Sequence, residues 1–231
     1  MAIFTPGSVV GQISGRIGAA VYSHNKGGPY IRNGTIPVVS TTPAALAAKQ
    51  RLGNLSAGWN SLTAGQRLAW KEWANQNPVI NRLGKAITLT GLPAYNMLNT
   101  RLLAAGLAAI DDPPIVVSPQ GMTSLTSTFD IGSGTFALTF APTPLGATEY
   151  LWIKAAVTNS ASINYVGNLL RFVGVSAAAQ ATGFDPQSLI EARFGTLVAG
   201  QYVHMEVSVF DGATGLISPP LRVDGVVTDT P

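Results

Sequence analysis

The sequence predicts an α+β fold, mainly β, because three stretches of its 231 residues carry three different patterns. Residues 1–42 are rich in glycine and in short β-type runs, which predicts an extended arm with hairpins. Residues 43–110 carry apolar residues at helical spacing and predict a small helical block. Residues 115–231 alternate short β-type runs with turn signals, which is typical of an antiparallel β-sandwich. Residues 111–114 read Asp-Asp-Pro-Pro and predict a linker.

The amino-acid composition favours a binding or structural role over that of a free-standing soluble monomer. Charged residues make up only 11% of the chain, whereas about a quarter is usual, so we expect much of the surface to face another protein. The charge is also divided along the chain. Residues 1–110 carry ten basic residues and one acid, a net +9, and residues 111–231 carry four basic residues and ten acids, a net −6. This asymmetry predicts two modules with different partners.

Several functional classes are disfavoured by what the sequence lacks. There is no cysteine, which removes disulfide scaffolds, cysteine nucleophiles and thiolate zinc sites. The first residues do not place an apolar core after a basic region, so we expect no signal peptide. No run approaches the roughly 20 apolar residues that span a bilayer, so we expect no membrane association.

The arm, residues 1–42, is predicted to bind a neighbouring protein. A glycine-rich turn separates the run Ala19–Ser23 from the run Tyr30–Arg32. Asn33-Gly34 then predicts a type I′ hairpin turn before the run Thr35–Val39. A segment so rich in glycine buries too little side chain to stabilise itself, so we expect its backbone to pair with a partner. A free tail is the alternative, although apolar residues are depleted in free tails. The residues expected to bind the partner are Ile13, Arg16, Ile17, Tyr22, Tyr30 and Arg32.

The helical block is predicted to contain three helices. Thr42 caps the first, and the capping box that begins at Thr63 opens the second, which ends before Pro78. The third runs from Pro93 to a glycine stop at Gly106. Apolar residues at helical spacing in the first helix are Leu46, Leu52, Leu55 and Trp59. The residues expected to form the helical core and to organise self-association are Trp59, Leu62, Trp70 and Trp73.

The strands of the C-terminal module are predicted from five runs separated by glycine, proline, asparagine or aspartate. Along one of them, valine or methionine alternates with other residues at Val203, Met205, Val207 and Val209, and this set is expected to face the core. The five runs are Thr135–Phe140, Tyr150–Val157, Leu169–Val175, Tyr202–Phe210 and Leu216–Val223.

No residue constellation supports catalysis, a metal or a cofactor. The two histidines, His24 and His204, belong to different modules, and neither has a partner at metal-ligand spacing. There is no nucleophile elbow and no phosphate-binding loop. We therefore expect a protein that is not an enzyme and that uses no cofactor.

The basic residues of the N-terminal half allow two interpretations. They have the charge to neutralise nucleic-acid phosphates, but they are spread over 110 residues without a dense run. A basic surface that meets an acidic protein lattice accounts for them equally well. We favour a protein partner over nucleic acid.

Through residues 136–144, 197–202 and 218–223, the C-terminal module resembles a fibronectin type III domain over about 115 residues. Residues 136–144 look like the second strand of that family and its proline-rich turn, with Phe140 where tryptophan is usual. Residues 197–202 are similar to its tyrosine corner, one residue short, and residues 218–223 to the start of its last strand. The resemblance implies display or spacing rather than chemistry.

Through segments such as residues 11–18, 28–33 and 59–63, the N-terminal half resembles a group of proteins encoded in tailed-phage genomes and prophages. The similarity covers about 100 residues and implies a virion component. An arm followed by an immunoglobulin-like module is also similar to the build of capsid decoration and cement proteins. The matching segments are residues 11–18, 22–23, 28–33, 42–43, 51–52, 59–63, 66–67 and 69–70.

Together these patterns predict a non-enzymatic structural protein on the capsid surface of a phage virion, assembled in the host cytoplasm. We expect the arm to clamp the major capsid protein, the helical block to associate with itself, for example as a homotrimer, and the sandwich to face outward. Three alternatives remain: a tail or neck component, a DNA-packaging accessory, and an adhesin that binds a receptor or glycan. In the adhesin, Trp152 and Tyr165 would contact sugar, although we favour a core position for Trp152.

Overall fold

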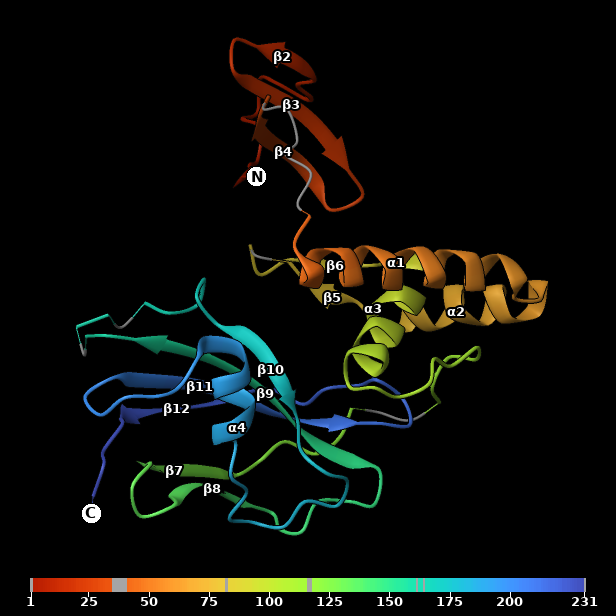
Figure 1. The fold of residues 1–231 in the computed structure, drawn as a ribbon. Helices are drawn as coiled ribbons and strands as arrows, with labels where there is room; N and C mark the ends of the chain where they lie inside the picture. Colours follow the sequence, from red (N-terminus) through yellow and green to blue (C-terminus); the bar gives the residue numbers. More distant parts are fainter. Residues whose placement is uncertain are drawn as a thin grey trace. The chain divides into compact units, whose positions relative to one another are not determined.

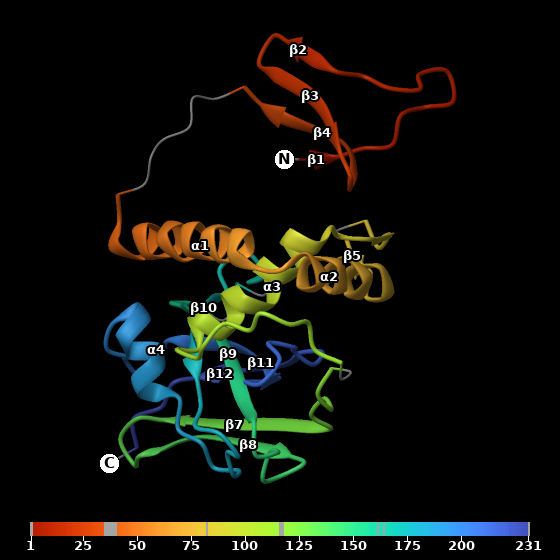
Figure 2. The same cartoon turned by 90° about the vertical axis from the view of Figure 1, so that its right-hand side faces the viewer.

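The fold mixes helices with antiparallel sheets, as predicted, and divides into two compact units (Figures 1 and 2). Unit 1 comprises Met1–Thr100 and Ile110–Pro113, and unit 2 comprises Arg101–Ala109 and Pro114–Pro231. Residues 101–109, expected in the helical block, therefore group with the C-terminal unit. The structure, a computed structural model, describes residues 2–34, 41–81, 83–115, 118–160, 162–163 and 165–230.

The N-terminal stretch forms a small antiparallel sheet in which its own strands pair with one another. The sequence instead predicts an extended arm whose backbone pairs with a partner. The strand order is β1-β4-β3-β2. The glycine-rich turn between the first two predicted runs forms a hairpin that joins β3 to β4, where the Oδ1 atom of Asn25 accepts a hydrogen bond from the backbone N–H of Gly27 and Gly28 adopts a positive φ of 110°. The run predicted after Asn33-Gly34 lies outside the described residues. The strands are β1 (Ala2–Ile3), β2 (Gly15–Ile17), β3 (Ala20–Asn25) and β4 (Gly28–Asn33).

Three helices follow, with the end signals that the sequence predicts. They are α1 (Pro43–Ser61), α2 (Ala64–Gln76) and α3 (Gly91–Ala104). Thr42 caps α1, Thr63 and Gln66 form the predicted capping box of α2, and Gly106 follows α3 with a positive φ of 78°. Helix α3 begins two residues before the predicted Pro93. Two short strands that the sequence analysis missed, β5 (Val79–Ile80) and β6 (Ala86–Ile87), pair between α2 and α3.

The aromatic rings of the helical block pack around Trp70, which is fully buried. Tyr95 of α3 contacts Trp70 edge-on, with ring centroids 5.4 Å apart, and also contacts Trp59 at 5.6 Å. The indole Nε1 of Trp70 donates a hydrogen bond of 2.6 Å to the backbone oxygen of Asp111. Trp70 is thus the most deeply buried of the predicted core tryptophans, and Trp59 and Trp73 are partly exposed. Leu46 and Leu52, by contrast, are about half exposed, because only the second half of α1 packs against the other helices.

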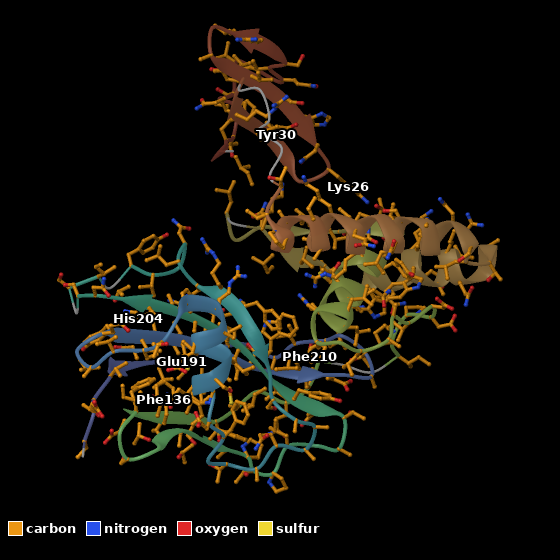
Figure 3. All side chains as sticks on the ribbon, in the orientation of Figure 1. Lys26, Tyr30, Phe136, Glu191, His204 and Phe210 are labelled. Carbon is orange, nitrogen blue, oxygen red and sulfur yellow. The ribbon has the colours of Figure 1, made fainter. Side chains whose placement is uncertain are left out.

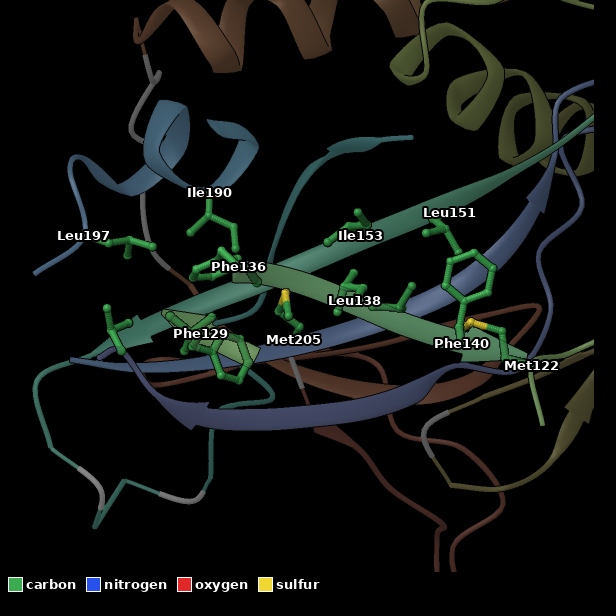
Figure 4. Close-up of a cluster of buried hydrophobic side chains, with 14 of the residues drawn as sticks. Met122, Phe129, Phe136, Leu138, Phe140, Leu151, Ile153, Ile190, Leu197 and Met205 are labelled. Atoms are coloured by element: carbon green, nitrogen blue, oxygen red, sulfur yellow. The ribbon is translucent and has the colours of Figure 1, made fainter. Parts of the chain in front are cut away.

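Unit 2 contains two sheets that contribute to a single hydrophobic core (Figure 4). The larger sheet is antiparallel with the order β10-β9-β11-β12, and the smaller is the β7-β8 hairpin. A short helix, α4 (Gln187–Phe194), which no sequence pattern signalled, adds Ile190 to this core. The strands are β7 (Ser124–Asp130), β8 (Thr135–Ala141), β9 (Glu149–Thr158), β10 (Arg171–Val175), β11 (Tyr202–Asp211) and β12 (Leu221–Val226).

Strand β11 is buried on both faces. The predicted core set is confirmed, since Val203, Met205, Val207 and Val209 are at most 1% exposed. The alternate residues are buried too, including Glu206, which is 8% exposed. This burial is possible because cations from both neighbouring strands satisfy the Glu206 carboxylate.

The Glu206 ion pairs join the three strands β9, β11 and β12. The Nζ atom of Lys154 lies 2.7 Å from one carboxylate oxygen, and the Nη2 atom of Arg222 lies 3.0 Å from the other. Burial alone raises the pKa of Glu206, but the hydrogen bonds and charges of Lys154 and Arg222 outweigh it and lower the pKa below its ordinary value.

The C-terminal segment closes the edge of β7 through Asp130. Thr228 forms a parallel bridge with Asp130, and the backbone N–H of Thr230 donates a 3.0 Å hydrogen bond to the Asp130 carboxylate. The backbone N–H groups of Gly132 and Ser133 donate to the same oxygen. Hydrogen bonds from Thr230 and Ser133 hold the pKa of Asp130 well below its ordinary value of 3.8.

We predict that Trp70→Ala destabilises unit 1 by about 3–5 kcal/mol, because it removes a fully buried indole and leaves a cavity. The matched change, Trp73→Ala, removes an indole of the same size that is partly exposed, so it should cost less. Urea unfolding followed by circular dichroism measures both values. Equal losses would contradict the packing described for Trp70.

We predict that Asp130→Asn lowers the stability of unit 2 at neutral pH. Since the folded pKa is depressed, the ionised carboxylate stabilises the fold fully above pH 3.8, the ordinary value, and this contribution is lost as the pH falls below it. The difference in the free energy of unfolding between Asp130→Asn and the unmodified chain should therefore become smaller as the pH falls from about 4 to about 2. Denaturant unfolding across this range measures it, with the exposed Asp224→Asn as the control. A constant difference would refute the prediction.

Candidate interaction surface

The cross-strand register of the N-terminal sheet places several apolar side chains together on one face, whereas Ile3, Val21 and Tyr30 lie on the other. Tyr22 of β3 lies directly opposite Ile31 of β4, and Ile17 of β2 lies opposite Ala20. Residues opposite each other in an antiparallel pair share a face, and so do alternate residues of one strand. Phe4 contacts the ring of Tyr22 edge-on at 6.1 Å. We call these residues the apolar face: Phe4, Ile17, Ala20, Tyr22 and Ile31.

The other side of the sheet carries two arginines. Val21 lies opposite both Arg16 of β2 and Arg32 of β4, so the three side chains form one row across the sheet. The Nε atom of Arg16 donates a 2.8 Å hydrogen bond to the backbone oxygen of Gly18, which fixes the guanidinium beside the β2-β3 turn. Tyr30, labelled in Figure 3, lies on the same side. We call Arg16, Val21, Tyr30 and Arg32 the basic face.

Neither face of this sheet is fully covered by the described residues. None of residues 3–34 is buried, and Ile17 on the apolar face is 69% exposed. A sheet of short strands needs a covered hydrophobic face for stability in water, because backbone ordering costs about 1–2 kcal/mol per residue. The N-terminal sheet is therefore the part of the chain that most requires a partner.

The sheet also leaves backbone groups at an edge. Strand β2 pairs with Ala20–Tyr22 only, so within the described residues no strand pairs with Ser23–Asn25 on the side away from β4. Unpaired N–H and C=O groups at an edge are a template for an added strand. The edge therefore offers a second means of attachment beside the apolar face.

The predicted arm residues fall into three groups. Ile17 and Tyr22 lie on the apolar face, whereas Arg16, Tyr30 and Arg32 lie on the basic face, so a flat partner surface contacts one set or the other. Ile13 is half buried in the loop before β2. The sequence analysis did not include Phe4 or Ile31 among the candidates, although the alternation along Gly28–Asn33 was a signal for Ile31.

The predicted self-association residues lie largely inside the helical block. Trp70 and Leu62 are 0% and 5% exposed, and Trp59 and Trp73 are half buried. They pack within their own chain, and self-association remains a prediction. The leucines that the helices expose instead are Leu46, Leu52 and Leu68, each at least half exposed.

The described residues contain no group of three His, Asp or Glu side chains that could hold a metal ion. His24 lies at the end of β3, and His204 lies on β11 in unit 2 (Figure 3). In the described part of the chain, no helix is both long and apolar enough to cross a membrane. The surfaces of the N-terminal sheet are thus the features that most clearly suggest a function.

The chain matches no family model, no curated protein and no solved structure.

Proposed function

We propose that this chain is a non-enzymatic structural protein of a tailed-phage virion, a decoration or cement protein that attaches to the major capsid protein. The observation that carries the proposal is the N-terminal sheet, in which none of residues 3–34 is buried. A chain that orders such a sheet gains stability only where another protein covers it. A clamp that binds the assembled shell but not free subunits then lowers the free energy of the assembled state.

The small size of the apolar face favours attachment through several N-terminal sheets at once, one from each copy of the chain in an oligomer. Full burial of an exposed large apolar side chain contributes about 1.5–3 kcal/mol, and since Phe4, Tyr22 and Ile31 are already partly buried in the free chain, these three and Ile17 together supply less than about 6–12 kcal/mol. Association costs about 4–15 kcal/mol in lost freedom of motion. One sheet alone therefore binds weakly, whereas a self-associated chain with several sheets binds tightly through avidity. This supports an oligomer such as a homotrimer, organised by the helical block.

For unit 2 we infer a fibronectin type III-like module that is displayed or acts as a spacer. The order β10-β9-β11-β12 matches the four-stranded sheet of an immunoglobulin-like sandwich, with β7-β8 as part of the second sheet. Leu197 is buried and Gly200 has a positive φ of 89° just before Tyr202, in keeping with a tyrosine-corner turn. Helix α4 departs from the pattern, because it occupies the segment before β11 where a strand is usual.

Two alternatives differ in how well the geometry supports them. An adhesin that uses Trp152 is disfavoured, because Trp152 is 8% exposed and stacks on Phe172 with ring centroids 4.0 Å apart. Tyr165, which is 81% exposed, still suits a sugar contact. A tail or neck component would use the same N-terminal sheet and differs only in the number of copies.

The proposal is tested by the protein composition of purified phage particles. A cement protein should be present at a simple ratio to the major capsid protein, such as one to one or one to three. A few copies per hundred capsid subunits would place the chain in the tail or neck instead. Absence from the particle would overturn the virion assignment.

We predict that Ile17→Asp weakens attachment to particles by at least about tenfold, because burying one isoleucine contributes about 1.5–3 kcal/mol and 1.4 kcal/mol is a factor of ten. The matched control is Ile80→Asp, since Ile80 is 67% exposed against 69% for Ile17 but lies in β5, outside the sheet. Co-sedimentation of each variant with particles that lack the chain measures attachment. Equal binding by both variants would refute the role of the apolar face.

A further inference from the structure

A groove in unit 1 runs beside the first turn of α3 and along the tip of the β3-β4 hairpin. Its inner part is a cavity of about 280 Å³, lined by Lys26, Trp59, Arg67, Lys71, Asn75 and residues 89–92. A neighbouring cavity of about 450 Å³ continues past Lys26, and its lining includes His24 and Lys85. A third cavity of about 330 Å³ shares Leu89 and Thr90 with the inner cavity and Ile87 and Thr88 with the neighbouring one, so the cavities form one continuous groove. Lys26, at the hairpin tip in Figure 3, borders all three.

The inner cavity is uniformly positive. Arg67 and Lys71 stand one turn apart on α2, at positions i and i+4 of the same helix face. Lys26 adds a third cation, and no acid lines either cavity. An anion in this cavity therefore meets three cations and no like charge.

The start of α3 adds to this potential because it lies directly against α2. A Cβ atom built on Gly91 would lie 3.2 Å from the backbone nitrogen of Lys71 and 3.4 Å from the backbone oxygen of Arg67. The first turn of α3 contains no acidic residue, and its backbone N–H groups carry the positive end of the helix dipole. The cations and the helix start thus converge on one cavity.

Beside the cations and the polar Asn75 and Thr90, the lining of the inner cavity is apolar, which selects among anions. The half-buried ring of Trp59 forms one wall, and Leu89 and Leu92 flank the helix start. A carboxylate on a short aliphatic stem satisfies both features, since the stem packs on the indole while the oxygens meet Arg67 and Lys71. The continuation toward Lys85 leaves room for a second acidic side chain of the same segment.

We propose that this groove binds an acidic segment of a partner polypeptide, with a glutamate or aspartate side chain in the inner cavity. Arg16 and Arg32 do not extend the groove, because they lie in a separate row on the N-terminal sheet. A nucleic-acid strand is best bound by a continuous basic track, so a compact groove favours a peptide. The inference goes beyond the virion assignment and does not depend on the apolar face.

The test measures binding of a fluorescein-labelled ten-residue peptide of alternating glycine and glutamate by fluorescence anisotropy. We expect the unmodified chain to bind this peptide. The double variant Arg67→Gln with Lys71→Gln should bind it at least about tenfold more weakly, a loss of about 1.4 kcal/mol in binding free energy. The control, Lys49→Gln with Arg51→Gln, removes two positive charges from α1 instead and should change the affinity by less than twofold. Both residues of the test pair are exposed, so the fold should persist, which circular dichroism verifies.

Three results would overturn the proposal. These are no binding by the unmodified chain at millimolar peptide, equal weakening in both double variants, or tighter binding of a duplex DNA oligonucleotide that the Arg67 and Lys71 changes abolish. The last result would assign the groove to nucleic-acid phosphates. Ile17→Asp should leave peptide binding unchanged, so failure of this proposal is distinguishable from failure of the proposed function.

Discussion

The N-terminal sheet lacks a hydrophobic core of its own within the described residues, and this lack determines what the chain requires from a partner. Four short strands order about thirty residues, yet Tyr22 and Ile31 meet across the sheet without being buried. The hydrophobic effect cannot offset the conformational entropy of such a sheet unless another surface covers it. The sequence therefore encodes strand pairing and turn geometry locally and leaves the stabilising contact to a partner.

Unit 2 satisfies the same physical requirement within its own chain. Its two sheets contribute to one core, α4 adds Ile190, and even the buried Glu206 is compensated by Lys154 and Arg222 from the flanking strands. The two units therefore differ in what stabilises them. One requires a partner, and the other is complete in itself and suited to display. The groove beside Gly91 gives unit 1 a second, charged surface that is chemically distinct from the apolar face.

Local signals made much of the fold predictable from the sequence. Caps and stops such as Thr63 and Gly106 act within a few residues, so the helix ends were found within about two positions. The alternation along Tyr202–Phe210 gave the core face of β11. Features that depend on distant parts of the chain were missed. The burial of Glu206 depends on cations from two other strands, and the placement of Arg16 and Ile17 on opposite faces of the sheet depends on how β2 pairs with β3. The groove forms only when α3 packs against α2, which no single segment encodes.

The most direct test of the central claim is amide hydrogen exchange across Ala20–Asn33, in the free chain and in the chain bound to purified particles. If a partner covers the N-terminal sheet, these amides should exchange rapidly in the free chain and become strongly protected on the particle, while the strands of unit 2 are protected in both states. Strong protection of Ala20–Asn33 already in the free chain, or no gain on binding, would contradict the account.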